Sequence, residues 1–240
     1  MNKKFSIISI TKNNRSGLAR TLKSIKFQIY TDFELIIVDG NSTDGTQNLI
    51  AAYKDIVTFV IKDNGSGIYA AMNLGIEAAN GMWVIFMNAG DCFANEYVLS
   101  NLPEDPDAYI MYGRTWTQRN DRKTLEHPPR FFWQRMPTAQ QAMFYKRDLF
   151  KRKKFDVRLT IAADYEFYLF VKKTGLLITE LDYDVALIES GGLSETEIIK
   201  RVWQTYKATV RYFHSYEVHR FYILKLLWAT KNQLKRIYKR

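Results

Sequence analysis

The first 95 residues alternate between short apolar runs and stretches in which apolar side chains recur at helical spacing. The uninterrupted apolar runs predict four strands, at residues 5–10, 33–38, 56–61 and 83–87, and the first two are expected to be buried. The stretches between them predict three helices, and Ser42 or Thr43 can cap the second, which would run to about Tyr53. This alternation predicts an α/β fold, with a mainly parallel sheet flanked by helices.

The second half of the chain has a weaker pattern. It predicts strands at residues 109–113 and 141–145 and a helix at residues 164–173. Residues 119–135 are polar and contain proline, so a loop is expected there. No proline or glycine occurs after residue 194, and the helical spacing there is strong. We therefore expect one domain over residues 1–195 and a helical extension over residues 196–240.

The net charge of +10 comes from the C-terminal end of the chain. Residues 1–197 hold 24 basic and 24 acidic side chains, whereas residues 198–240 hold 11 basic side chains and one acid, Glu217. Because apolar residues that include Trp203 and Trp228 recur among the basic ones, we expect an amphipathic helix or hairpin on an anionic membrane surface. A helix packed on the body, with a solvated basic face, is the alternative. Nucleic-acid binding would leave the tryptophans unexplained.

Composition narrows the class of protein. Hydrophobic residues make up 47% of the chain and charged residues 25%, which is typical of a globular protein. The single cysteine, Cys92, allows no intrachain disulfide and indicates a reducing compartment. Three histidines are too few for a zinc site built from His and Cys. No apolar run reaches the roughly 18 residues that a membrane span needs, so a cytoplasmic body is expected.

Polar side chains follow the four predicted strands where each one ends. They are Thr11, Asp39, Asp63 and Asp91. Ligands of open parallel sheets bind beyond the carboxyl ends of the strands, so we expect these side chains to converge on one edge. The Asp39 carboxylate can accept hydrogen bonds from a nucleobase or a ribose hydroxyl, and Asp91 can anchor Mg²⁺ or Mn²⁺. Turn formation and helix capping are the alternative roles for these residues.

A second nucleotide-binding pattern is also present. Gly65-Ser66-Gly67 begins a match to the G-x-G-x-x-G/A pattern of dinucleotide-binding loops, so an NAD(P)-binding oxidoreductase is an alternative. That pattern normally follows the first strand of its sheet, whereas here two strand–helix units precede it. A non-catalytic, membrane-associated protein is a further alternative.

Taken together, four segments resemble family-2 glycosyltransferases of the GT-A fold. They are residues 5–14, 33–46 (with VDGNSTDGT), 63–75 (DNGSGIYAAMNLG) and 81–91 (GMWVIFMNAGD). The resemblance covers about residues 3–195. It is closest to the bacterial enzymes that build colanic acid, O-antigen and capsule repeat units.

The resemblance implies roles for individual residues. Thr11, Asp39 and Asp63 match positions that hold the uridine of a UDP-sugar. Asp91 matches the last acid of the metal-binding D-x-D element, which implies Mg²⁺ or Mn²⁺ as cofactor. Asp164 matches the general base of inverting members, and a carboxylate near the acceptor hydroxyl can take its proton during attack on the anomeric carbon.

For Asp164, a helix N-cap or a partner for Arg158 is the alternative. The chain departs from the family's pattern in three places. The D-x-D element is reduced to Asn88-x-x-Asp91, so metal binding would rest mainly on one carboxylate; Ala70 replaces the usual aspartate, and Gln140 replaces the usual histidine. The expected contacts to the acceptor or the diphosphate are Gln140, Gln141 and Ser194.

The expected function is therefore that of an inverting, metal-dependent glycosyltransferase. It would move a hexose from a UDP-sugar to a lipid-linked saccharide acceptor in bacterial surface polysaccharide biosynthesis, including that of lipopolysaccharide. Residues 1–95 would form the nucleotide-sugar half and residues 96–195 the acceptor half. The enzyme would be peripheral, on the inner face of the cell membrane.

Overall fold

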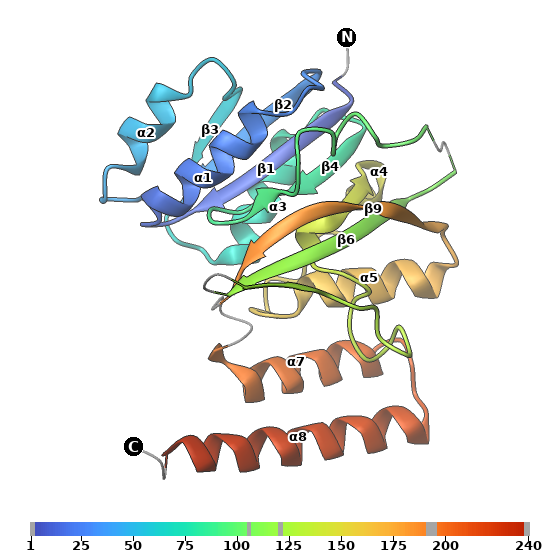
Figure 1. Cartoon of the computed structure of the whole chain (residues 1–240). Helices are drawn as coiled ribbons and strands as arrows, with labels where there is room; N and C mark the ends of the chain where they lie inside the picture. Colours follow the sequence, from blue (N-terminus) through green and yellow to red (C-terminus); the bar gives the residue numbers. More distant parts are fainter. Residues whose placement is uncertain (1–2, 105–106, 120–121, 191–195, 238–240) are drawn as a thin grey trace.

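The computed structural model describes residues 3–104, 107–119, 122–190 and 196–237 (Figure 1). All four strands and all three helices expected in the first half are present. They are β1 (Phe5–Thr11), α1 (Arg15–Lys26), β2 (Phe33–Asp39), α2 (Thr46–Ala52), β3 (Phe59–Lys62), α3 (Ile68–Ala78) and β4 (Trp83–Phe86). The expected cap of α2 is wrong, because α2 begins at Thr46 and its N-cap residue is Gly45.

The second half contains more strands than its sequence pattern indicates. Its elements are β5 (Cys92–Phe93), β6 (Ile110–Arg119), β7 (Arg122–Leu125), the 3₁₀ helix η1 (Gln140–Ala142), β8 (Met143–Lys146), α4 (Asp148–Arg152), α5 (Ala163–Thr174) and β9 (Ile178–Glu189). The strand expected at 109–113 extends to Arg119, and β7 lies inside the expected loop. The long strand β9 was not predicted.

All these strands form a single mixed sheet. Its order is β3-β2-β1-β4-β8-β6-β9-β5, and β7 pairs with β6. The strands β1 to β4 are parallel, whereas β8 runs antiparallel to both β4 and β6. The expected α/β class is therefore confirmed, with antiparallel pairs added in the second half.

Helices cover both faces of the sheet, and this explains the uninterrupted apolar strands. Leu35 and Ile37 of β2 pack in the core beneath α1, while Ile36 and Val38 point to the opposite face, which is covered by α3, α4 and α5. Each such side chain contributes about 1.5–3 kcal/mol when it is fully buried. The helices packed on both faces of the sheet thus fix the positions of the residues at the strand ends.

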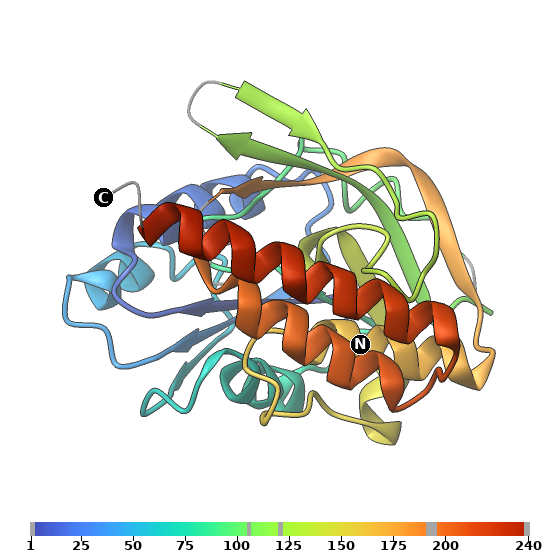
Figure 2. The same cartoon turned by 90° about the horizontal axis from the view of Figure 1, so that it is seen from below.

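Two further helices, α7 (Ile198–Val210) and α8 (Tyr216–Ile237), form an antiparallel hairpin, named here the C-terminal hairpin. The hairpin lies beneath α5, and α8 is outermost (Figures 1 and 2). Its inner face buries Val202, Val218 and Tyr222 around Trp133 of the body. The packing on the body expected by the alternative interpretation is thus present. Among the helices of the described ranges, none has the length and apolar character of a membrane span.

Candidate functional site

The ends of β1, β2 and β3 bring Thr11, Asp39 and Asp63 into one row. Thr11 is the register partner of Asp39 across the parallel pair of β1 and β2. The backbone N–H of Asp63 donates to the carbonyl of Asp39 at 2.8 Å. All three residues are buried. The structure therefore places the first three residues expected at the sheet edge side by side.

The turns that follow the strands hold these carboxylates in position. The backbone N–H of Ser42 donates to both oxygens of Asp39, at 3.2 and 3.4 Å. The hydroxyl of Ser66 donates to Asp63 at 2.7 Å, and the Ser66 N–H donates to the same carboxylate. Each carboxylate keeps further acceptor capacity, because an ionised carboxyl group offers about four lone pairs.

Lys12 lies across the same row and was missed at the sequence level. Its aliphatic carbons lie against Gly40, and its Nζ lies 2.9 Å from the position that a Cβ at Gly65 would take. Gly65 also has a φ of +81°, so a larger residue there would be both strained and in contact with the lysine. A cation is thus available beside Asp39 and Asp63.

Asp91 lies on the tight turn between β4 and β5. The buried hydroxyl of Thr21 on α1 holds this turn, because it donates to the Asp91 carbonyl at 2.7 Å and accepts from the Gly90 N–H at 3.0 Å. The Asp91 carboxylate accepts a hydrogen bond from Gln141 Nε2 at 2.6 Å. Gln141, expected near the acceptor or the diphosphate, is therefore next to the expected metal ligand.

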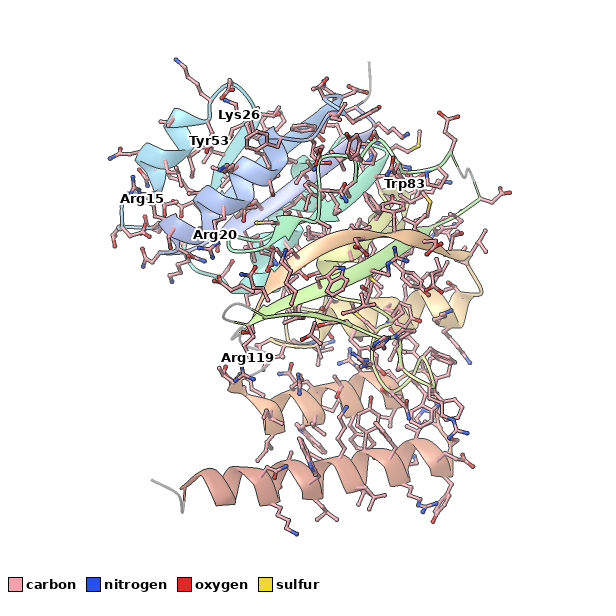
Figure 3. The ribbon with its side chains drawn as sticks, viewed as in Figure 1. Arg15, Arg20, Lys26, Tyr53, Trp83 and Arg119 are labelled. Atoms are coloured by element: carbon pink, nitrogen blue, oxygen red, sulfur yellow. The ribbon has the colours of Figure 1, made fainter. Side chains whose placement is uncertain are left out.

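Burial raises the pKa of Asp91 to about 6, although the hydrogen bond from Gln141 lowers it. A hydrogen bond from the backbone N–H of the neighbouring Glu189 also lowers the pKa, whereas the charge of the Glu189 carboxylate raises it. Arg20 of α1, which is labelled in Figure 3, pairs with Glu189 at 2.5 Å. This carboxyl group is therefore costly to ionise without a cation.

Asp164 lies in the first turn of α5 and is held by a tyrosine from α3. The Tyr69 hydroxyl donates to Asp164 Oδ1 at 2.7 Å, and the Tyr165 N–H donates to the same oxygen at 2.8 Å. Burial raises the pKa of Asp164, and the hydrogen bond from Tyr69 lowers it. Arg158 instead pairs with Asp156 at 2.8 Å. Tyr69 is on α3, six residues after Asp63 at the sheet edge. The helix α3 therefore links Asp164 to that edge.

Buried side-chain polar atoms without a hydrogen-bond partner occur at the expected site and also elsewhere in the described residues. Thr11 Oγ1, Asn88 Oδ1 and Gln140 Nε2 lie at or beside the expected site residues, whereas Ser9 Oγ and Glu166 Oε2 do not. Such groups cost about 1–3 kcal/mol each unless something pairs with them. Buried groups left unpaired at a sheet edge indicate a binding site. Ser194, the last expected contact, lies outside the described residues.

The donor set fits a hard divalent cation bound with phosphates. Asp91 and the unpaired oxygen of Asn88 lie on the same turn. Mg²⁺ and Mn²⁺ are commonly held by one or two protein carboxylates together with substrate phosphates and water. A cluster of three or more His, Cys, Asp or Glu side chains does not occur in the part of the chain that is described. A cation at this turn would therefore need phosphate oxygens as well.

Comparison with known proteins decides the family. The sequence model of "Glycosyl transferase family 2" matches residues 6–162. The chain belongs to glycosyl transferase family 2. A PGL/p-HBAD biosynthesis glycosyltransferase of Mycobacterium tuberculosis is 30% identical over 223 residues, covering 86% of this chain and 87% of the relative. The poly(ribitol-phosphate) beta-N-acetylglucosaminyltransferase TarP of Staphylococcus aureus is 37% identical over 94 residues, covering 37% of this chain and 29% of TarP.

Solved structures confirm the GT-A fold of this family-2 glycosyltransferase. S. aureus TarS in complex with UDP-GlcNAc superposes with a TM-score of 0.70 at 18% identity, covering 93% of this chain and 71% of TarS. Mannosyltransferase PcManGT from Pyrobaculum calidifontis, in complex with GDP-Man and Mn²⁺, gives the same TM-score and identity and covers 94% and 69%. Family membership excludes the NAD(P)-binding interpretation of Gly65-Ser66-Gly67, where Ser66 instead holds Asp63.

Proposed function

We propose that this glycosyltransferase moves a hexose from a UDP-sugar to a lipid-linked saccharide, with inversion at the anomeric carbon. The proposed place is the inner face of the cell membrane, in the biosynthesis of a bacterial surface polysaccharide. The observation that carries the proposal is the set of carboxylates and unpaired buried polar atoms at one edge of the sheet. Relatives in cell-surface glycan synthesis support the acceptor class.

In the proposed donor site, Asp39 and Asp63 accept hydrogen bonds from the uracil and the ribose. The Thr11 hydroxyl, which has no partner among the described residues, would pair with the same nucleoside. Lys12 Nζ would lie near the diphosphate. Asp91 and Asn88 would hold Mg²⁺ or Mn²⁺, which when bound neutralises charge on the departing diphosphate.

In the proposed transfer step, Asp164 takes the proton of the acceptor hydroxyl. The acceptor oxygen forms its bond to the anomeric carbon as the bond from that carbon to the diphosphate oxygen breaks, and UDP leaves with the electron pair. Attack from the face opposite the leaving group inverts the configuration. The pKa of Asp164 is raised by burial, and this makes the carboxylate a stronger base.

A donor screen tests the proposed function. Release of the nucleoside diphosphate would be measured over a panel of UDP- and GDP-sugars, with Mn²⁺ and a polyprenyl-diphosphate saccharide present. We expect turnover with a UDP-hexose and none with GDP-sugars. Turnover with GDP-mannose alone would contradict the assigned donor, and absence of nucleotide binding would favour a non-catalytic protein.

Tyr69→Phe removes the hydroxyl that donates to Asp164. Loss of a hydrogen bond to the charged form raises the pKa of the carboxyl group, so the acidic limb of the kcat profile should move to higher pH. At pH 6 we expect kcat about tenfold below wild type, since a hydrogen bond to a charged group contributes about 1.5–3 kcal/mol. Tyr145→Phe is the matched control, because that buried hydroxyl bonds Met143 Sδ instead. Equal shifts in both variants would contradict the assignment.

The outer face of α8 supports the proposed membrane contact. Five apolar side chains recur at helical spacing and are each more than half exposed: Tyr216, Ile223, Leu224, Leu227 and Trp228. The exposed Arg220 and Lys231 continue the same helical spacing. An apolar stripe that carries cations fits an anionic lipid surface, where each basic side chain contributes about 1 kcal/mol.

Leu227→Ala combined with Trp228→Ala should weaken sedimentation with vesicles of anionic phospholipid at least about tenfold, because two apolar side chains are lost from the interface. Phe27→Ala with Ile29→Ala is the matched control, since these residues are 63% and 57% exposed, against 64% and 58% for the α8 pair. Binding should also fall with salt and be weak on neutral vesicles. Equal binding by the two double variants would contradict the membrane assignment.

A further inference from the structure

The C-terminal hairpin holds the chain that leads into Asp164. Gln204 of α7 accepts a hydrogen bond from the Ile161 N–H at 2.9 Å. Its Nε2 also donates to Thr160 Oγ1 at 3.1 Å. One side chain of the hairpin thus holds both Thr160 and Ile161, which lie just before α5.

The residue that follows Asp164 is held by the same hairpin. The Tyr165 hydroxyl donates to the Trp133 carbonyl at 2.5 Å and lies 3.0 Å from Thr209 Oγ1 and 3.2 Å from the Tyr222 hydroxyl. The Tyr222 hydroxyl also donates to the Trp133 carbonyl, at 3.0 Å. These polar groups form a buried network that joins α5, α7, α8 and the Trp133 loop, and such networks fix the geometry of their members.

Glu166 makes a third connection. This carboxylate is fully buried, and its Oε1 accepts from the Tyr212 hydroxyl at 2.5 Å. Lys153 and Arg211 lie 3.1 and 3.4 Å from the same oxygen. Arg211 also pairs with Asp156 at 2.8 Å. Removal of a partner from a buried carboxylate is costly, so this connection resists displacement.

The first turn of α5 has no hydrogen bond from an N-cap side chain. Its N-cap residue, Ala162, has no side chain that can accept from the first backbone N–H groups. Asp164 itself accepts from the Tyr165 N–H. The hydrogen bonds from the hairpin therefore fall on both sides of Asp164, at the place where the helix is least constrained by itself.

We propose that the C-terminal hairpin is the positioning element for Asp164, and that Gln204, Thr209, Tyr212 and Tyr222 are its positioning residues. None of the four need touch the substrate: they hold residues 160–166 so that the Asp164 carboxylate meets the acceptor hydroxyl. The inference rests on the proposed role of Asp164 as base. A misplacement of about 1 Å at a reacting group can cost about 100-fold in rate.

The test compares single hydroxyl deletions within the hairpin. Tyr212→Phe and Tyr222→Phe remove hydroxyls that bond α5 or its network, whereas the control Tyr206→Phe removes one that bonds His219 Nδ1 within the hairpin. We expect faster amide hydrogen exchange in peptides covering residues 160–168 for the first two variants. We also expect kcat about tenfold lower, with the affinity for UDP unchanged, while Tyr206→Phe resembles wild type.

The outcomes separate the positioning proposal from the proposed function. The first outcome applies when the wild type turns over and Asp164→Asn does not. If Tyr212→Phe and Tyr222→Phe then have the same amide exchange and the same kcat as Tyr206→Phe, the positioning role alone is overturned. A parallel loss of kcat and UDP affinity would indicate general damage to the fold and would also overturn it. If the wild type turns over no donor, the proposed function fails. Unchanged amide exchange at residues 160–168 in Tyr212→Phe and Tyr222→Phe would still refute the proposal that the hairpin holds this segment.

Discussion

Asp164→Asn should lower kcat by about 10²- to 10⁴-fold, the range that a general base usually contributes. Asparagine has nearly the same shape, and its side-chain oxygen can still accept from the Tyr69 hydroxyl and the Tyr165 N–H. Because the amide cannot take a proton from the acceptor hydroxyl, the chemical step should fail while the donor site stays intact. Single-turnover kinetics and a UDP titration measure the two quantities separately.

The matched control is Asp148→Asn, which changes an exposed acid on α4 that pairs with Lys151. It should keep both turnover and UDP affinity. Retained turnover in Asp164→Asn, at wild-type UDP affinity, would remove Asp164 from the proposed mechanism without affecting the donor assignment.

Asp91→Asn should have the second largest effect. It should remove the effect of metal on UDP affinity, and it should stabilise the metal-free protein. In the variant, Mn²⁺ should no longer increase UDP affinity, because the ionised ligand is lost. Without metal, the variant should unfold at a higher temperature than wild type near pH 7. The pKa of Asp91 is raised to about 6 in the folded protein, so the ionised carboxylate destabilises the fold above that pH, and asparagine removes this cost.

The pH dependence follows from the same shift. The stability advantage of Asp91→Asn should shrink as the pH falls through about 6 and vanish near 3.8, where the unfolded carboxyl group also takes up its proton. In wild type, Mn²⁺ affinity should decline below pH 6, since a proton then competes for the ligand. Asp55→Asn, at an exposed acid that pairs with Lys26, is the control and should show no such gain. A destabilised metal-free Asp91→Asn would contradict this account.

The sequence predicted the parallel half of the sheet because each of its strands is apolar on both faces. It missed β9 because Glu180, Asp182 and Asp184 interrupt the apolar pattern. Arg114 on β6 pairs with Asp182 and Asp184, and Tyr112 donates to Glu180, so the strand is stabilised across the sheet by partners about 70 residues away. No local pattern reports such a pairing.

The edge residues could be predicted, since the end of an apolar run marks the end of a strand. The contacts that tune them could not. Tyr69 and Asp164 are 95 residues apart, and Gln141 and Asp91 are 50 apart. The cap expected for α2 failed for a similar reason: Ser42 accepts from the backbone N–H of the distant Asn13. Distance along the chain, more than residue type, limited the interpretation.

The match to the family model ends at residue 162, one residue before α5 begins. The helix that carries Asp164 thus follows directly after the matched region, and the hairpin that contacts it lies wholly beyond. A chimera that exchanged only residues 196–240 with a relative would pair one protein's Glu166 and Tyr165 with another's α7 and α8. A graft intended to change the acceptor should therefore keep residues 156–222 together, with its junction between β8 and Asp156.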